Sequence, residues 1–176
     1  MSQTNLVITA LGSDRSGIVK DLSSLIANHG ANIQDSRMTV LGGEFAIIMM
    51  VSGPEENIQE LEKKLPSEVE ALNLTTIIKR TSGRETCHDT IAYVTEIIAI
   101  DNPGIVSDIT GFFSNRSINI DDLTTGTYAA PHTGTQMFNL TMRVNIPSSQ
   151  SIAQLKDDFI QFCDDRNLDA IIEPLR

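Results

Sequence analysis

A six-residue motif occurs twice in this chain of 176 residues. The first copy is Asp-Arg-Ser-Gly-Ile-Val at residues 14–19, and the second is Asp-Asn-Pro-Gly-Ile-Val at residues 101–106. Each copy follows a short apolar run with the character of a buried strand and precedes apolar residues at helical spacing. Because the second copy starts 87 residues after the first, close to half the chain length, the repeat predicts two small domains of one topology.

The hydrophobic periodicity predicts the same order of elements in both halves. In the first half it predicts strands over residues 6–11, 31–41, 44–51 and 74–79 and helices over residues 18–29 and 55–72. In the second half it predicts strands over residues 91–100, from 119, over 138–144 and over 170–172 and helices over residues 105–113 and 147–163, the last opened by Pro147 and Ser148. Gly30 is expected to end the first helix in a left-handed conformation, and Gly42-Gly43 to form a tight hairpin turn. Pro66 predicts a kink or break in the second helix near Leu65.

Each half therefore has the order β-α-β-β-α-β. Right-handed crossovers around a hairpin give a four-stranded antiparallel sheet with both helices on one face, which is the ferredoxin-like α+β arrangement. We place the first domain at residues 1–80, a linker at residues 81–90 and the second domain at residues 91–176. The second hairpin is longer than the first, so residues 126–134 are predicted to form a polar, flexible loop.

The strands that return from the two hairpins differ in pattern. Residues 44–51 are apolar on both faces, with Ile48 and Met50 on the second face, whereas residues 138–144 alternate between apolar and polar side chains. The first pattern predicts a strand covered on both sides, and the second predicts a strand with one polar face. A homodimer is one way to cover the second apolar face and the outer strand edges.

The two motif copies place a carboxylate and a glycine where a strand meets a helix. We call residues 14–18 the first corner and residues 101–105 the second corner. Backbone N–H groups at a helix start attract a carboxylate, an aspartate offsets an ammonium group, and glycine permits close approach, so a corner can hold a small amino acid. The alternative is helix capping alone, with Asp14 and Ser16 as N-caps and Pro103 at the first helical position.

The charge and the hydropathy of the chain exclude several classes of partner. The formal net charge is −10, and neither half carries a basic stripe, which argues against direct binding to DNA, RNA or an anionic membrane. The longest apolar run is too short to span a bilayer, and the N-terminus lacks the features of a signal peptide. We therefore expect a cytoplasmic protein in which Cys87 and Cys163 are reduced thiols.

Residues with catalytic or metal-binding potential form no known pattern. The candidate metal ligands are Cys87, His88, His132 and Cys163. Their spacing matches no zinc motif, and the chain lacks the common motifs of nucleophilic catalysis and phosphate binding, so we expect neither an enzyme nor a bound cofactor. The paired acids at residues 157–158 and 164–165 are interpreted as the solvated face of the last helix.

The repeated Asp-x-x-Gly-Ile-Val corner on this element order resembles the ACT domain, a ferredoxin-like regulatory module. The resemblance extends over nearly the whole chain and is strengthened by Gly-Ala-Asn-Ile at residues 30–33 and Ser-Ile-Asn-Ile at residues 117–120. The ligand residues that it implies are Asp14, Ser16, Gly17, Ile18, Asn32 and Ile33 in the first half, and Asp101, Pro103, Gly104, Ile105, Asn119 and Ile120 in the second. Asn32 and Asn119 have an alternative role, which is to stabilise the turn into the next strand.

The resemblance also implies a function and partners. ACT domains usually bind amino acids between paired domains, and glycine is the ligand that we expect here. An acidic tandem of this length is similar to regulators that bind no DNA themselves and act on a DNA-binding transcriptional activator. The alternative is a regulatory subunit of an amino-acid biosynthetic enzyme, which is also built on such domains.

Overall fold

The computed structural model describes residues 3–82 and 89–175. The chain divides into two compact units, Met1–Glu85 and Thr86–Arg176. Residues 83–88, which form most of the predicted linker, lie outside the described residues, while Thr81 and Thr90 belong to strands.

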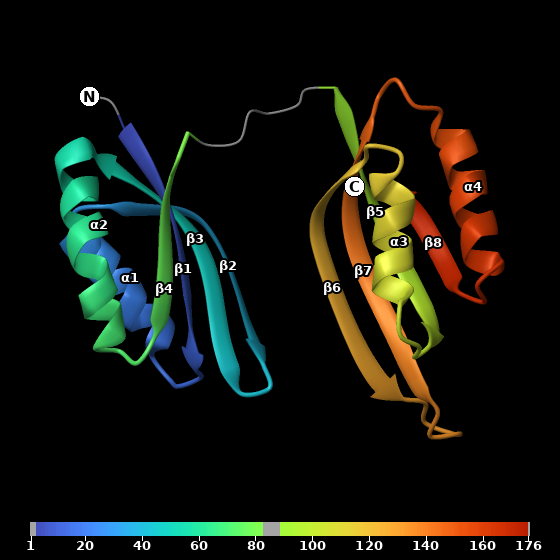
Figure 1. Ribbon diagram of the computed structural model, residues 1–176, viewed down its shortest axis with the longest axis horizontal. Helices are drawn as coiled ribbons and strands as arrows, with labels where there is room; N and C mark the ends of the chain where they lie inside the picture. The colour runs from blue at the N-terminus through green and yellow to red at the C-terminus, as the bar shows by residue number, and fades with distance from the viewer. Residues whose placement is uncertain (1–2, 83–88, 176) are drawn as a thin grey trace. The chain divides into compact units, whose positions relative to one another are not determined.

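Both units have the predicted element order (Figure 1). The first unit consists of β1 (Gln3–Ser13), α1 (Ile18–Asn28), β2 (Asn32–Leu41), β3 (Glu44–Pro54), α2 (Glu55–Glu70) and β4 (Thr75–Thr81). The second unit consists of β5 (Thr90–Ile100), α3 (Ile105–Ser114), β6 (Asn119–Ala129), β7 (Gln136–Pro147), α4 (Ile152–Asp164) and β8 (Asp169–Pro174). The strand orders are β2-β3-β1-β4 and β6-β7-β5-β8, with antiparallel pairing between all neighbours. The ferredoxin-like α+β prediction is confirmed.

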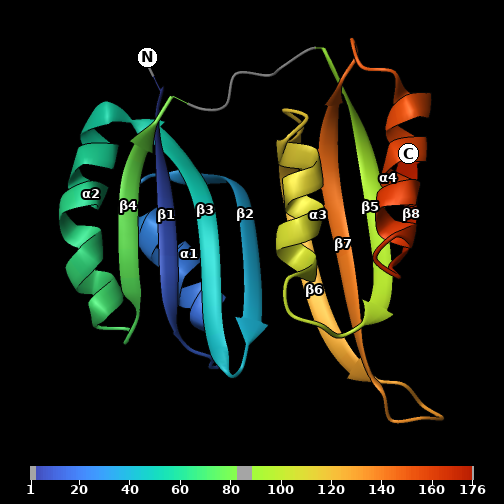
Figure 2. The ribbon, with the colours of Figure 1, turned by 45° about the vertical axis from the view of Figure 1, so that its right-hand side comes forward.

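Each unit has its own hydrophobic core between its sheet and its two helices (Figure 2). In the first unit, alternate residues of the central strands point toward the helices, and Leu6, Ile8 and Phe45 are almost completely buried. They pack with helix residues such as Leu22 and Leu61, which are 2% and 0% exposed. The two periodicities, two in the strands and 3.6 in the helices, therefore converge on one buried layer.

The glycines at two turns adopt the backbone conformations that the sequence predicts. Gly42 and Gly43 have φ values of 61° and 88°, as a primed hairpin turn requires, and Gly30 has φ 69° just after α1. Left-handed backbone of this kind strains other residues by roughly 1–2 kcal/mol, which explains the choice of glycine.

Helix α2 continues through Pro66, so the break predicted near Leu65 as one of two possibilities is wrong. Proline in a helix interior removes one backbone hydrogen bond and costs about 3 kcal/mol. Residues on both sides of it, Leu61, Leu65 and Val69, are at most 1% exposed. Burial of each large apolar side chain contributes roughly 1.5–3 kcal/mol, which is enough to keep the helix continuous.

The structure corrects two predicted boundaries in the second unit. Residues 126–129 of the predicted loop belong to β6, where Gly126 pairs with Asn139, and a Cβ at Gly126 would lie 2.8 Å from the Asn139 Oδ1. Pro147 ends β7 instead of opening α4. The N-cap of α4 is Ser151, whose hydroxyl accepts from the Gln154 N–H at 3.4 Å, so the helix begins at Ile152.

The sheet faces away from the helices differ between the units. In the first unit, this outer face carries Leu11, Ile48 and Ile77 on three strands, and these side chains are 52%, 49% and 71% exposed. In the second unit, Thr141 takes the place of Ile48 and pairs with Glu96 across the strands. The polar face predicted for residues 138–144 is confirmed. In the described part of the chain, no helix is long and apolar enough to cross a membrane.

Candidate functional site

The two corners have the same backbone geometry. Gly17 is the N-cap of α1 with φ 86° and ψ −2°, and Gly104 is the N-cap of α3 with φ 101° and ψ −16°. The Asp14 N–H donates to the Gly43 carbonyl, and the Asp101 N–H donates to the Gln136 carbonyl, both at 3.0 Å. Each corner is thus tied to the end of its hairpin, and the sequence repeat is also a structural repeat.

The capping interpretation of the corners is wrong. Asp14, Ser16 and Asp101 are exposed, and none of these side chains accepts a hydrogen bond from a described residue. Pro103 precedes the N-cap and is therefore not the first helical residue. The first N–H groups of an α-helix have no partner within the helix. The Ile18 N–H donates to the Arg15 carbonyl at 3.4 Å, so among the described residues the next two amides of α1 and the first three of α3 are left free, close in sequence to an unpaired carboxylate.

The asparagine–isoleucine pairs lie away from the corners of their own units. Asn32 and Ile33 follow the C-terminal end of α1, and a helix of 11 residues spans about 16 Å. The strand register agrees, because Asn32 lies opposite Ser52 while the end of β1 lies opposite Glu44. Asn119 and Ile120 stand in the same relation to α3, so neither unit gathers all six of its predicted ligand residues in one place.

The two corners differ in the residue that follows aspartate. In the first corner, Arg15 donates to the Asp21 carboxylate at 2.8 Å, which holds a guanidinium beside the first turn of α1. In the second corner, the corresponding Asn102 side chain donates to the Ile100 carbonyl at 3.2 Å. A hollow of about 560 Å³ lies at the second corner, lined by residues 101–107 and Phe138. The second corner therefore combines the free amides with a concave surface.

The structure reveals a further set of residues that the motif search did not identify. Asp108, Phe112 and Arg116 are four residues apart on and just beyond α3, and Asp158, Phe162 and Arg166 repeat this spacing on and just beyond α4. Each arginine lies 3.8 Å from the centre of the phenylalanine ring one turn before it. Arg116 also pairs with Asp158 at 3.6 Å, and Arg166 with Asp108 at 3.4 Å, so the two helices are joined twice.

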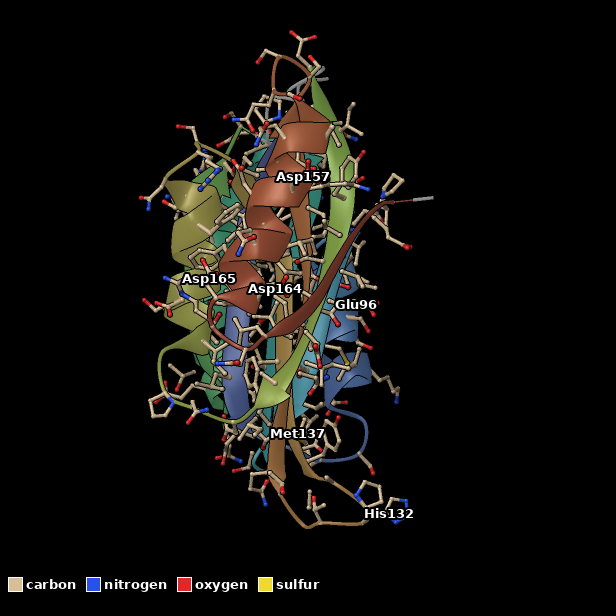
Figure 3. The ribbon with its side chains drawn as sticks, turned by 90° about the vertical axis from the view of Figure 1, so that its right-hand side faces the viewer. Glu96, His132, Met137, Asp157, Asp164 and Asp165 are labelled. Atoms are coloured by element: carbon tan, nitrogen blue, oxygen red, sulfur yellow. The ribbon has the colours of Figure 1, made fainter. Side chains whose placement is uncertain are left out.

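The signal for these residues is the repeated Asp-x-x-x-Phe-x-x-x-Arg spacing, which puts three side chains on one helix face. The rings of Phe112 and Phe162 lie 5.0 Å apart and form the floor of an open groove between the helices. Figure 3 shows α4 from its outer side, with Asp157, Asp164 and Asp165 along it. These three side chains are exposed, as predicted.

Among the described residues, no group of three or more histidine, cysteine, aspartate or glutamate side chains is arranged to hold a metal ion. Cys87 and His88 lie outside the described residues, so the expectation for them stays a prediction. Cys163 is fully buried, and burial raises the pKa of its thiol to about 12. A thiol in this state is a poor nucleophile and a poor metal ligand at neutral pH.

Comparison with known proteins accounts for both units. The model of the ACT domain matches residues 4–79, and the model of the AHAS small subunit-like ACT domain matches residues 96–158. The glycine cleavage system transcriptional repressor of Escherichia coli (strain K12) is 32% identical over 166 residues, which cover 94% of this chain and 87% of that protein. The chain belongs to the ACT-domain family, as a tandem protein related to this repressor.

Two solved structures share the tandem ACT architecture. A crystal structure provisionally assigned as a glycine cleavage system transcriptional repressor has a TM-score of 0.77 and 27% identity, covering 100% of this chain and 99% of that chain. A protein of unknown function from Galdieria sulphuraria has a TM-score of 0.81 and 29% identity, covering 99% of this chain and 100% of that chain. The predicted ACT resemblance and tandem fold are confirmed.

Proposed function

We propose that this protein is a non-catalytic, amino-acid-responsive regulator in the cytoplasm that represses transcription of the glycine cleavage system through a DNA-binding activator protein. The observation that carries the proposal is the pair of equivalent corners, each with uncapped helix amides beside an unpaired carboxylate. The relation to the repressor of Escherichia coli supports the transcriptional role.

The corners suit glycine for a chemical reason. The ligand carboxylate binds the first N–H groups of α1 or α3, where the helix dipole favours an anion. The ligand ammonium binds Asp14 or Asp101, which are the exposed carboxylates of the two corners. Gly17 and Gly104 have open space where a Cβ would lie, so the ligand reaches the backbone. A ligand with so few atoms makes few contacts, and we expect modest affinity.

The positions of Asn32 and Asn119 bear on the assembly. Because each lies at the far end of its own unit from the corner, it reaches a bound amino acid only if another ACT unit lies alongside. A homodimer provides such a unit. We therefore propose that Asn32, Ile33, Asn119 and Ile120 contribute to ligand binding in the dimer and not within one unit.

The acidic charge supports indirect repression. A protein with a net charge of −10 repels the phosphate backbone of DNA, and specific DNA binding generally requires neutralisation of several phosphates by lysine and arginine. An acidic protein that changes transcription is thus expected to act on a protein partner, and a DNA-binding activator offers the complementary basic surface.

Calorimetric titration of glycine into the full chain tests the ligand-binding half of the proposal. We expect measurable heat with glycine and a loss of about tenfold or more in affinity when Asp14 or Asp101 of a competent corner is replaced by asparagine. Asp89→Asn is the matched control, because Asp89 is exposed just before β5 begins, at the opposite end of that strand from the second corner. Absence of heat with every amino acid would reject amino-acid sensing.

A second candidate function is that of a regulatory subunit of an amino-acid biosynthetic enzyme. The observation in its favour is the match of residues 96–158 to the AHAS small subunit-like ACT domain. Affinity purification of the tagged chain, with and without glycine, separates the two candidates. Recovery of a transcription factor that is released by glycine supports the first, and recovery of a biosynthetic enzyme supports the second.

A further inference from the structure

The groove between α3 and α4, here called the helix groove, is a concave surface that the proposed amino-acid site does not use. Its volume is about 770 Å³, and it is lined by residues of 107–116 on one side and of 157–166 on the other. None of residues 101–105 lines it, so the helix groove is separate from the second corner. The two helices lie side by side in Figure 3, and eight residues of α4, from Asp157 to Asp165, extend over about 12 Å. The helix groove is therefore long enough for about two turns of another helix.

The two arginines of the helix groove already have partners within the second unit. Arg116 lies over the Phe112 ring, donates to the Phe112 carbonyl at 3.2 Å and pairs with Asp158. Arg166 makes equivalent contacts with the ring and the carbonyl of Phe162 and with an aspartate of α3. Each guanidinium is thus held at one end of the aromatic floor, where its charge is balanced by a carboxylate. We therefore expect no anionic ligand here.

The wall formed by α4 keeps negative charge that is not balanced in this way. Four aspartates and two arginines line the helix groove, so its formal charge is −2. Among the described residues, Asp157 has no hydrogen-bond or ion-pair partner, and Asp165 accepts a hydrogen bond from the neutral Gln161 amide at 2.8 Å. Both aspartates are exposed. This wall is complementary to a row of cationic side chains.

The opposite wall is open at Gly111, in the middle of α3. A Cβ built on Gly111 would have no atom within 4 Å, and the residue is part of a regular helix. Glycine in a helix interior lowers stability relative to alanine. Neither the backbone conformation nor packing within the unit requires glycine at this position, whereas close approach of another chain does. Gly111 therefore points to an occupant that contacts the backbone of α3.

We propose that the helix groove is the docking surface for a basic helix of the partner protein. Lysine or arginine side chains about two turns apart on that helix bind Asp157 and Asp165, and its backbone lies over Gly111. A second copy of this chain is a poor occupant, because its net charge of −10 is repelled by the acidic wall. The inference rests on the proposed function in one respect, which is that this protein acts through a protein partner.

Binding of a synthetic helix to the full chain tests the proposal. The probe is a fluorescent, alanine-based helical peptide with arginine at every fourth position, and fluorescence anisotropy at low salt measures its affinity. The same peptide with glutamine in place of arginine should not bind. The double variant Asp157→Asn and Asp165→Asn should weaken binding about fivefold, because two ion pairs are lost. Gly111→Gln should weaken binding about tenfold or more, because its side chain fills the helix groove.

Matched controls separate the helix groove from overall charge and from helix stability. The double variant Glu56→Gln and Glu70→Gln removes the same charge from exposed positions of α2 and should bind the peptide as the wild type does. Ser114→Gln adds the same side chain to α3 at an exposed position outside the helix groove and should also bind normally. Gly111→Gln should not lower the melting temperature, because glutamine favours helix and meets no atom there.

The remaining outcomes would overturn the proposal. Equal losses in the α2 and α4 double variants would show that the peptide senses only the net charge, and unchanged binding by Gly111→Gln would place the peptide outside the helix groove. Self-association of the wild type that Gly111→Gln abolishes, seen by sedimentation velocity, would assign the groove to a second copy. A chain that binds glycine but not the arginine peptide would overturn this inference alone. A chain that binds the peptide but no amino acid would reject sensing and leave the docking surface intact.

Discussion

The two ACT units have one topology and two different cores. The first core is mainly aliphatic, with Phe45 as its buried aromatic residue. The second core contains a cluster of rings from α3 and α4, whose centres lie 5.0–5.2 Å apart. The fold therefore depends on the pattern of inward positions and tolerates a change from aliphatic to aromatic packing, as hydrophobic cores generally do when volume is kept.

The surfaces of the units differ more than their cores. Helices α1 and α2 are linked by a contact of 2.9 Å between His29 and Glu68, whereas α3 and α4 are linked by two stacked arginine–aspartate pairs. On the outer sheet faces, Ile48 in the first unit corresponds to Thr141 in the second. Such outward positions are free to change without loss of the fold, so differences in function between the units are expected there.

The largest expected effect tests whether the aromatic cluster of the second core contributes more to stability than the corresponding aliphatic residues of the first core. Phe112→Ala removes a ring that packs on two core phenylalanines and supports Arg116, and should lower the free energy of unfolding by about 3–5 kcal/mol. Leu25 of α1 is half-buried and occupies the position that corresponds to Phe112. Leu25→Ala should lower the free energy of unfolding by about 1–2 kcal/mol. Urea denaturation followed by circular dichroism measures both, and equal costs would contradict a special role for the aromatic cluster.

A smaller effect compares the two corners directly. Gly17→Ala and Gly104→Ala each force a side chain into left-handed backbone with no steric contact, so each should cost about 1–2 kcal/mol in stability. Glycine affinity, measured by calorimetry, should fall only for the variant of a competent corner. Loss of affinity in both variants would show that both corners bind, and loss in neither would place the ligand elsewhere.

The sequence was sufficient to predict the fold because its signals are local. The continuous apolar run in residues 44–51 and the alternation in residues 138–144 define two of the strands, and the apolar stripe that begins at Ile18 or Ile105 defines the first helix of each unit. Both features depend on neighbours within a few residues. Boundaries were less certain where packing competes with propensity, as at Pro66, where burial keeps α2 continuous.

The candidate site was predicted only in part, for physical reasons. The corners are local in sequence, but the glycine N-cap depends on backbone geometry that residue preference alone does not define. Asn32 was carried over from the family, and the length of α1 separates it from the corner of its own unit. The pairing of Arg166 with Asp108 joins residues from two different helices, so it becomes visible only when α3 and α4 are placed side by side.

The outer sheet faces provide a third, weaker test. If the proposed homodimer uses the apolar face of the first unit, Ile48→Glu should dissociate it, whereas Thr141→Glu should not. Because Ile48 is 49% exposed within one chain, its replacement should change the free energy of unfolding by about 0.5 kcal/mol or less. Sedimentation velocity measures the assembly, and a dimer that survives Ile48→Glu would exclude this face.

The smallest effect concerns the hydrogen bonds of the first unit that join Glu55 of α2 to strands β1 and β4. A hydrogen bond from the Thr4 hydroxyl, followed by those from Arg80 and Gln59, lowers the pKa of Glu55 from 4.5 to about 2. A carboxyl with a lowered pKa stabilises the folded state above its unfolded pKa and loses that contribution as pH falls through the folded value. The contribution of Glu55 is therefore complete above about pH 4.5 and disappears toward pH 2.

Glu55→Gln and Thr4→Val test how much these hydrogen bonds to Glu55 contribute to stability. Thermal unfolding between pH 2 and pH 4.5 should show a slightly steeper loss of stability for the wild-type chain than for Glu55→Gln, because only the wild type protonates this carboxyl within that window. Thr4→Val should reduce the difference, since the Thr4 hydroxyl is the largest cause of the lowered pKa. Parallel pH profiles for all three proteins would show that solvent screening removes the contribution of these hydrogen bonds to stability, as it does for many exposed ion pairs.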